Sequence, residues 1–314
     1  MKWVLLLVVP VLMLSACERN EAAGSSVTPA PTLAEARPGF QTHLIRKEQI
    51  GGKAPGAPAD LFRTLHYPSP AGPLVAYVSP SPGDGKKRPL IIWLTGGFSN
   101  SISEIAWTPG PEENDQSAST FRKAGILMMY PSLRGGNDNP GSLEGFYGEV
   151  DDVIAAAQYA SKLDYVDPNR IYLGGHSTGG TLALLVAEST GSFRPIFAFG
   201  PAEDVSGYGQ EYLPFDVTNP KEVLLRSPIK WLNGIRTPTF VFEGTDGQAN
   251  IAALKTLAQA KHSSVVSFFP IRGGNHFNIL APVSRLIATK IASDDEAESS
   301  IRFSEQELAA AMSR

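Results

Sequence analysis

Six short apolar runs constrain the fold of this 314-residue chain more than any other feature. They lie at residues 90–94, 126–130, 170–173, 196–199, 239–242 and 265–269. Segments with helical patterns separate them, near residues 115–124, 148–162, 179–189, 249–261 and 282–292. Apolar strands that alternate with amphipathic helices are typical of a mostly parallel sheet covered by helices on both faces. The alternation therefore predicts an α/β fold.

Two further strands are predicted ahead of this alternation. Residues 61–67 and 74–78 alternate apolar and polar side chains, and the proline-rich stretch between them indicates the turn of an antiparallel hairpin. With the six apolar runs, the hairpin gives a sheet of the eight-stranded type. Residues 202–236 interrupt the alternation and predict a small cap inside a domain that spans residues 40–293. Residues 294–314 are predicted to form a peripheral tail, with a capping box at Ser304 and Glu307 opening a short helix.

The N-terminal segment is typical of a secretory signal. Lys2 precedes an apolar run at residues 3–14, which is too short to span a membrane. Residues 14–17, Leu-Ser-Ala-Cys, resemble the lipobox of bacterial lipoproteins. This resemblance implies cleavage before Cys17 and lipidation of its thiol. We expect a signal peptide at residues 1–16, a flexible tether at 17–39, and a lipid anchor on Cys17 at the periplasmic side of a bacterial outer membrane. The alternative is an ordinary cleaved signal with a free cysteine.

Charge and composition exclude some classes of function. The formal net charge is −4 and the basic residues are scattered, so no surface for nucleic acid is expected. The sequence contains neither HExxH nor clustered histidine and cysteine ligands. We therefore expect no metal and no cofactor.

Residues 175–179 read Gly-His-Ser-Thr-Gly and fit the pattern G-x-S-x-G. A predicted strand runs into this segment and a predicted helix leaves it, which is the context of a nucleophile elbow. Ser177 is therefore the candidate nucleophile. The alternative is a glycine-rich turn that carries no chemistry.

A serine hydroxyl needs a neighbouring base, and His276 is the candidate among the five histidines. It follows the last predicted strand, and catalytic loops of such sheets follow the carboxyl ends of strands. A histidine that only stabilises its loop is the alternative. His176, which precedes Ser177, is predicted to point away and to serve packing.

Asp246 is the candidate acid that orients this base. It lies in the turn after the strand at 239–242, and the order Ser177, Asp246, His276 is the one expected of such a triad. Three rival carboxylates remain, namely Glu243 in the same turn and Glu203 and Asp204 after the preceding strand.

The oxyanion of an acyl-transfer intermediate needs two N–H donors. The backbone amide of Thr178 is one candidate, because it follows the nucleophile. The loop after the strand at 90–94 contains Gly97 and Phe98, whose amides are candidates for the second. The acidic residues Glu149, Asp151 and Asp152 open a predicted helix, where we interpret them as complementing its dipole.

Four short segments give the chain a family resemblance: Thr-Gly-Gly-Phe at 95–98, Arg-Gly-Gly at 134–136, Glu-Val-Asp-Asp at 149–152 and Asp-Pro-Asn-Arg at 167–170. Over residues 60–292 the chain resembles the prolyl oligopeptidase-like branch of the α/β-hydrolases, the peptidase S9 catalytic domain. The resemblance implies an α/β-hydrolase fold and a triad of Ser177, Asp246 and His276 that acts through an acyl-enzyme.

The expected substrate is a small ester or peptide. We expect no β-propeller ahead of the domain, so a carboxylesterase without peptidase activity is an equal alternative to a peptidase. Thr95 stands where that family often has an oxyanion-hole tyrosine. A lipoprotein that keeps the fold as a non-catalytic scaffold is the alternative from another class.

Overall fold

The computed structural model describes Met1 and residues 31–313. Apart from Met1, the predicted signal peptide lies outside the described residues, and so does Cys17. The lipid anchor therefore stays a prediction. Within the described part of the chain, no helix combines the length and the apolar character needed to cross a membrane.

One eight-stranded sheet organises the fold, in the order β1-β2-β4-β3-β5-β6-β7-β8. The strands are β1 (Arg63–Ser69), β2 (Gly72–Val78), β3 (Arg88–Leu94), β4 (Leu127–Pro131), β5 (Val166–His176), β6 (Ile196–Phe199), β7 (Thr239–Gly244) and β8 (Val266–Ile271). The pairs β1/β2 and β2/β4 are antiparallel, and all other pairs are parallel. The predicted hairpin and the predicted parallel strands are thus present, and the α/β-hydrolase fold is confirmed.

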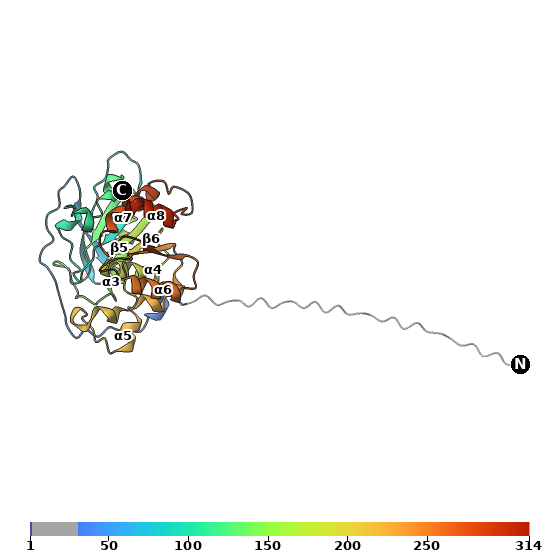
Figure 1. The fold of residues 1–314 in the computed structure, drawn as a ribbon. Helices are drawn as coiled ribbons and strands as arrows, with labels where there is room; N and C mark the ends of the chain where they lie inside the picture. Colours follow the sequence, from blue (N-terminus) through green and yellow to red (C-terminus); the bar gives the residue numbers. More distant parts are fainter. Residues whose placement is uncertain (2–30, 314) are drawn as a thin grey trace.

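Helices cover both faces of this sheet (Figure 1). They are α1 (Leu33–Ala36), α2 (Thr120–Lys123), α3 (Glu149–Ala160), α4 (Thr178–Ala187), α5 (Pro220–Leu224), α6 (Ile251–Ala260), α7 (Leu280–Ala292) and α8 (Glu305–Met312). Helices α3, α4 and α6 lie on one face of the sheet, and α7 and α8 lie on the other (Figure 1). The loops that follow the carboxyl ends of the parallel strands lie at one edge of the sheet.

Strand β3 shows why the predicted strands are continuously apolar. Successive side chains of a strand point to opposite faces of its sheet. Leu90 and Ile92 join the core on the side of α3 and α4, whereas Ile91 and Trp93 join the core on the side of α7. Because both faces are covered, none of these positions can be polar without burying an unpaired group.

Two local predictions have different outcomes. The capping box is present, because the Ser304 hydroxyl accepts from the Glu307 amide and the Glu307 carboxylate accepts from the Ser304 amide. The helix predicted near residues 115–124 is limited to Thr120–Lys123. The Asp115 carboxylate accepts from the amide of Ser117, and such a local turn competes with helix formation.

The folded part of the chain begins earlier than predicted. Within the predicted tether at 17–39, the described residues start at 31, and Leu33 in α1 is fully buried. Arg37 forms an ion pair with Asp151 of α3 at 2.6 Å. The boundary drawn at residue 40 is therefore corrected toward residue 31, since a capping box on Thr32 and one buried leucine fix this short helix against the domain.

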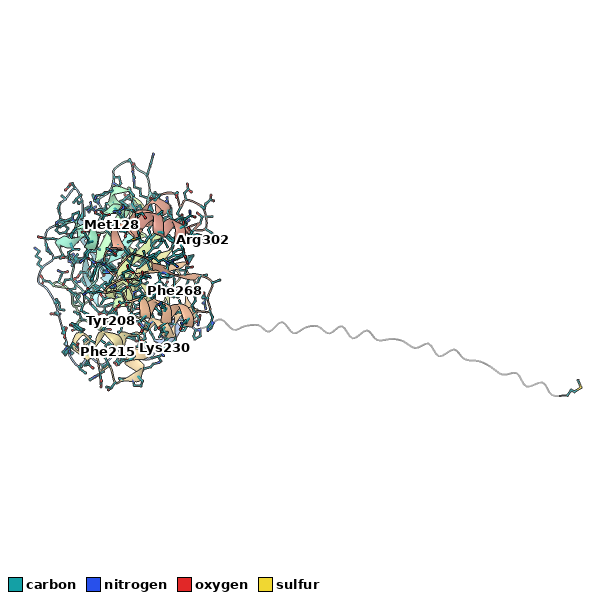
Figure 2. The ribbon with its side chains drawn as sticks, viewed as in Figure 1. Met128, Tyr208, Phe215, Lys230, Phe268 and Arg302 are labelled. Carbon is teal, nitrogen blue, oxygen red and sulfur yellow. The ribbon has the colours of Figure 1, made fainter. Side chains whose placement is uncertain are left out.

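An insertion between β6 and β7 corresponds to the predicted cap. It consists of α5 and four short 3₁₀ helices at Val205–Tyr208, Gln210–Tyr212, Pro228–Lys230 and Leu232–Gly234. Figure 2 shows Tyr208, Phe215 and Lys230 of this insertion at the lower end of the view, on the opposite side from Arg302. Arg226 is fully buried and paired with Glu222, and it also donates to the carbonyl oxygen of Glu144 and the hydroxyl of Thr42, so this pair fixes the insertion to the rest of the domain.

We expect Glu188, the C-terminal cap of α4, to make stability depend on pH. It is fully buried, and neither carboxyl oxygen has a hydrogen-bond partner among the described residues. Burial raises the pKa of Glu188 well above its ordinary value of 4.5. The folded state therefore keeps a proton that the unfolded state loses, so stability falls as pH rises above 4.5.

The free energy of unfolding is expected to fall by at most about 1.4 kcal/mol per pH unit because of Glu188. In Glu188→Gln this contribution disappears, so urea unfolding from pH 5 to 8 is expected to show a smaller loss of stability in the variant. Parallel stability curves for the two proteins would contradict the assignment.

Candidate active site

Ser177 forms the sharp turn between β5 and α4. Its backbone has φ 56° and ψ −118°, a strained conformation for a residue with a side chain. Two glycines of the pattern are required by close packing: a Cβ on Gly175 would lie 2.3 Å from the carbonyl oxygen of Gly179, and a Cβ on Gly179 would lie 2.3 Å from that of Leu94. The sequence pattern thus produces the elbow that lifts the hydroxyl above the sheet edge.

His276 lies in the loop between β8 and α7, at the same edge of the sheet. The side chain is 7% exposed, and its Nδ1 lies 2.9 Å from Oε2 of Glu243. An ionised carboxylate only accepts hydrogen bonds, so Nδ1 carries the proton and Nε2 is left as the basic nitrogen. No hydrogen bond among the described residues joins this ring to the Ser177 hydroxyl, a contact that is often long before substrate binds.

The carboxylate that contacts His276 belongs to Glu243, so the prediction that Asp246 contacts this imidazole is corrected. Asp246 is exposed, its side chain accepts from the Thr245 hydroxyl, and its amide donates to Gly274. Strand β7 continues to Gly244, two residues beyond the predicted end. Glu243 is therefore a buried strand residue beside His276, and the turn that carries Asp246 begins only beyond the sheet.

His176 contacts the loop of His276, although the sequence suggested only packing. It is 1% exposed, and its Nε2 donates to the carbonyl oxygen of His276 at 2.9 Å. Its Nδ1 accepts from Gln116 at 3.0 Å. Burial lowers the pKa of His176 to about 3, the neighbouring His276 adds to this, and the hydrogen bond to the carbonyl of His276 opposes it. A neutral His176 thus holds the loop of His276 in place.

The predicted oxyanion donors come together beside Ser177. The hydroxyl of Thr178 donates to the carbonyl oxygen of Gly97 at 2.5 Å, which fixes the loop after β3 to the start of α4. None of the hydrogen bonds described for residues 31–313 uses the backbone amides of Gly97 or Phe98. The first amides of a helix, such as that of Thr178, also lack partners inside the helix.

A cavity of about 70 Å³ adjoins these donors. Phe98, Phe146 and Thr178 line it, as does Tyr212 of the insertion. Phe98 stacks on Tyr212 with ring centroids 4.7 Å apart, and Phe146 stacks on Tyr208 at 5.5 Å. The insertion therefore covers one side of the cavity with aromatic rings.

Two other aromatic residues, Trp107 and Tyr147, do not line this cavity. Trp107 packs on Tyr77, and Tyr147 packs on Phe40. In the described part of the chain, no three histidine, cysteine, aspartate or glutamate side chains are grouped to hold a metal ion.

Gly200 is expected to control the position of the imidazole. It has φ 57°, and a Cβ there would lie 2.4 Å from Cε1 of His276 and 2.7 Å from Oε2 of Glu243. Gly200→Ala should displace the ring and lower kcat/KM by about 100-fold, since misplacing a catalytic group by about 1 Å has an effect of that size.

The matched control is Gly125→Ala. Gly125 has φ 77°, and no atom lies within 4 Å of a Cβ added there. Both variants carry the cost of a left-handed alanine, about 1–2 kcal/mol, which thermal unfolding measures. Equal activity in the two variants would contradict this role of Gly200.

Comparisons with known proteins give one family match and several similar solved structures. Residues 113–246 match the prolyl oligopeptidase family, peptidase S9. No curated protein sequence matches the chain.

Similar solved structures include peptidases and an esterase. A puromycin-hydrolysing peptidase of Mycobacterium tuberculosis has a TM-score of 0.58 and 19% identity, over 76% of this chain and 39% of that one. Dipeptidyl peptidase 4 of Porphyromonas gingivalis has a TM-score of 0.55 and 18% identity, over 68% of this chain and 32% of that one. An esterase of Pyrobaculum calidifontis has a TM-score of 0.51 and 19% identity, over 75% of this chain and 86% of that one.

The chain thus aligns with less than half the length of both peptidases and with most of the esterase. These structures share its fold, whereas the family match includes the elbow and Glu243. The chain therefore has the α/β-hydrolase fold, and its residues 113–246 match the prolyl oligopeptidase family.

Proposed function

We propose that the chain hydrolyses small esters or amides through an acyl-enzyme on Ser177. The observation that carries the proposal is the pairing of His276 with buried Glu243 at the sheet edge where the strained elbow presents Ser177. Nε2 of His276 accepts the serine proton while the serine oxygen attacks the substrate carbonyl carbon. The same proton then goes to the leaving alcohol or amine.

The second half-reaction uses the same groups. Water attacks the acyl-enzyme carbonyl, gives a proton to His276, and releases the carboxylic acid and the free Ser177 hydroxyl. In both halves the amides of Thr178 and of Gly97 or Phe98 stabilise the negative oxygen of the intermediate. Glu243 holds the tautomer of His276 and stabilises the imidazolium.

The cavity beside the oxyanion donors supports a short acyl group. Its volume of about 70 Å³ is smaller than the roughly 150 Å³ apolar cavity that holds benzene. The structures with a similar fold include a peptidase that hydrolyses puromycin and an esterase. The test therefore includes amide substrates, with an amine leaving group, and ester substrates, with an alcohol leaving group.

We expect p-nitrophenyl acetate and propionate to be hydrolysed at least tenfold more efficiently than p-nitrophenyl octanoate. A parallel series of acyl p-nitroanilides and of dipeptidyl p-nitroanilides compares amide with ester hydrolysis. Failure to turn over any of these substrates would contradict the proposal and favour a non-catalytic scaffold. A preference for octanoate would contradict the size of the acyl site.

A further inference from the structure

Glu149, the first residue of α3, is a buried carboxylate that the proposed reaction does not use. It is 2% exposed, and its Oε1 accepts from Asn100 at 3.1 Å and from the amide of Glu144 at 2.7 Å. Its Oε2 is buried and has no hydrogen-bond partner among the described residues. Leaving a buried carboxylate oxygen without a donor is costly, so such a group calls for an explanation.

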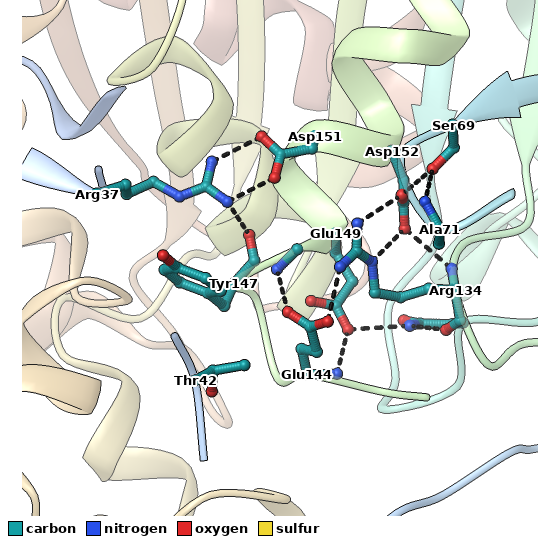
Figure 3. Close-up of polar contacts among 12 residues, drawn as sticks. Arg37, Thr42, Ser69, Ala71, Arg134, Glu144, Tyr147, Glu149, Asp151 and Asp152 are labelled. Carbon is teal, nitrogen blue, oxygen red and sulfur yellow. Dashed lines mark hydrogen bonds and ion pairs between the residues drawn. The ribbon is translucent and has the colours of Figure 1, made fainter. Parts of the chain in front are cut away.

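The nearby cations are already engaged. Figure 3 shows Arg134 between Asp152 and Glu144, which it contacts at 2.9 and 2.7 Å. Figure 3 also shows Asp151 paired with Arg37. In α3, the two aspartates are therefore each paired with an arginine, whereas Glu149 accepts only from neutral donors.

This polar cluster carries an excess of negative charge. The carboxylates Glu144, Glu149 and Asp152 lie around the guanidinium of Arg134. The other buried arginine, Arg226, also acts on Glu144 and Glu149, but its charge is balanced by Glu222 of α5, with which it is paired. Burial raises the pKa of Glu149, Glu144 acts in the same direction, and Arg134 opposes both. One additional positive charge near Glu149 would therefore be stabilised.

Glu149 lines the same cavity as the candidate oxyanion donors Thr178 and Gly97. The rings of Phe98 and Phe146 line it as well, and the faces of aromatic rings attract cations. An acyl group held at the oxyanion donors would thus extend into a space that contains a carboxylate and aromatic rings.

We propose that Glu149 binds a protonated amino group of the substrate, so that the enzyme selects aminoacyl esters or amides over neutral acyl groups. The inference rests on the proposed hydrolytic function and specifies its substrate class. An ammonium group donates to the free Oε2, neutralises the local excess charge and packs against the rings. A neutral acyl group leaves Oε2 without a donor, and a site built for a hydrogen bond rejects such an analogue strongly.

The test compares alanyl, lactyl and propionyl p-nitrophenyl esters, which carry an amino group, a hydroxyl or a hydrogen at the same carbon. For the wild-type protein we expect kcat/KM to be about 10- to 100-fold higher for the alanyl ester, the range for a hydrogen bond to a charged group. Glu149→Gln should lose this preference, because kcat/KM falls more for the alanyl ester than for the lactyl and propionyl esters.

Glu188→Gln is the matched control, because Glu188 is also a buried glutamate with carboxyl oxygens that lack partners among the described residues, and it does not line the cavity. It should keep the preference. The inference would be overturned if the wild-type protein hydrolysed the alanyl ester at the same rate as the propionyl ester or the lactyl ester. It would also be overturned if Glu149→Gln lost the same fraction of activity on all three esters.

A second measurement keeps the two proposals separate. If no ester is hydrolysed and a fluorophosphonate does not label Ser177, the proposed function fails. Calorimetric titration of the wild-type protein with propylammonium then tests amine binding at Glu149 independently of hydrolysis. Saturable binding of propylammonium but not of propanol, weakened at least tenfold in Glu149→Gln, supports it. Should Glu149→Gln not fold, equal binding of the two ligands to the wild-type protein would overturn it.

Discussion

Ser177→Ala is expected to lower kcat/KM by about 10⁶-fold and to abolish labelling by a fluorophosphonate. The serine oxygen is the atom that bonds to the acyl carbon, and no other side chain replaces it at the elbow. The substitution keeps Cβ, so the backbone conformation at φ 56° and its strain remain. The stability of the variant should therefore stay within about 0.5 kcal/mol of the wild-type value.

The measurement is labelling and ester hydrolysis, with thermal unfolding as the control for folding. Equal labelling of the wild-type protein and Ser177→Ala would show that the nucleophile lies elsewhere. Residual hydrolysis about 10³-fold above the uncatalysed rate would not contradict the assignment, since oxyanion donors and binding persist without the nucleophile.

Glu243→Gln is expected to lower kcat by about 10⁴-fold. The ionised carboxylate accepts from Nδ1 of His276 at 2.9 Å and thereby leaves Nε2 without a proton. A glutamine amide can donate to Nδ1 instead, which moves the proton to Nε2 and removes the base. The fold should persist, because glutamine has the same size as the buried glutamate.

Asp246→Asn is the matched control and should keep at least half of the wild-type kcat. Asp246 is exposed and contacts Thr245, one residue away, so its charge does not face the imidazole. The pair of variants separates the two carboxylates in one assay, by steady-state ester hydrolysis at saturating substrate. A large loss in Asp246→Asn with normal activity in Glu243→Gln would restore the assignment made from the sequence.

The sequence alone determined the fold and the candidate nucleophile, because both depend on local patterns. Six continuous apolar runs that alternate with helical segments, and a hairpin of alternating side chains ahead of them, identified the strands of the sheet to within a few residues. The strand, the glycine-rich turn and the helix around Ser177 are contiguous, so residues 166–187 contain the whole elbow. The loop of His276 followed from the rule that catalytic loops leave the carboxyl ends of parallel strands.

Only the tertiary structure decided which carboxylate meets the imidazole and what fills the pocket. Glu243 and Asp246 are three residues apart, and the choice between them depends on how far β7 pairs with β8, a long-range interaction. The contact of His176 with the loop of His276 crosses 100 positions of the chain. The free oxygen of Glu149 likewise reflects the pairing of its neighbours with Arg37 and Arg134, which no local pattern encodes.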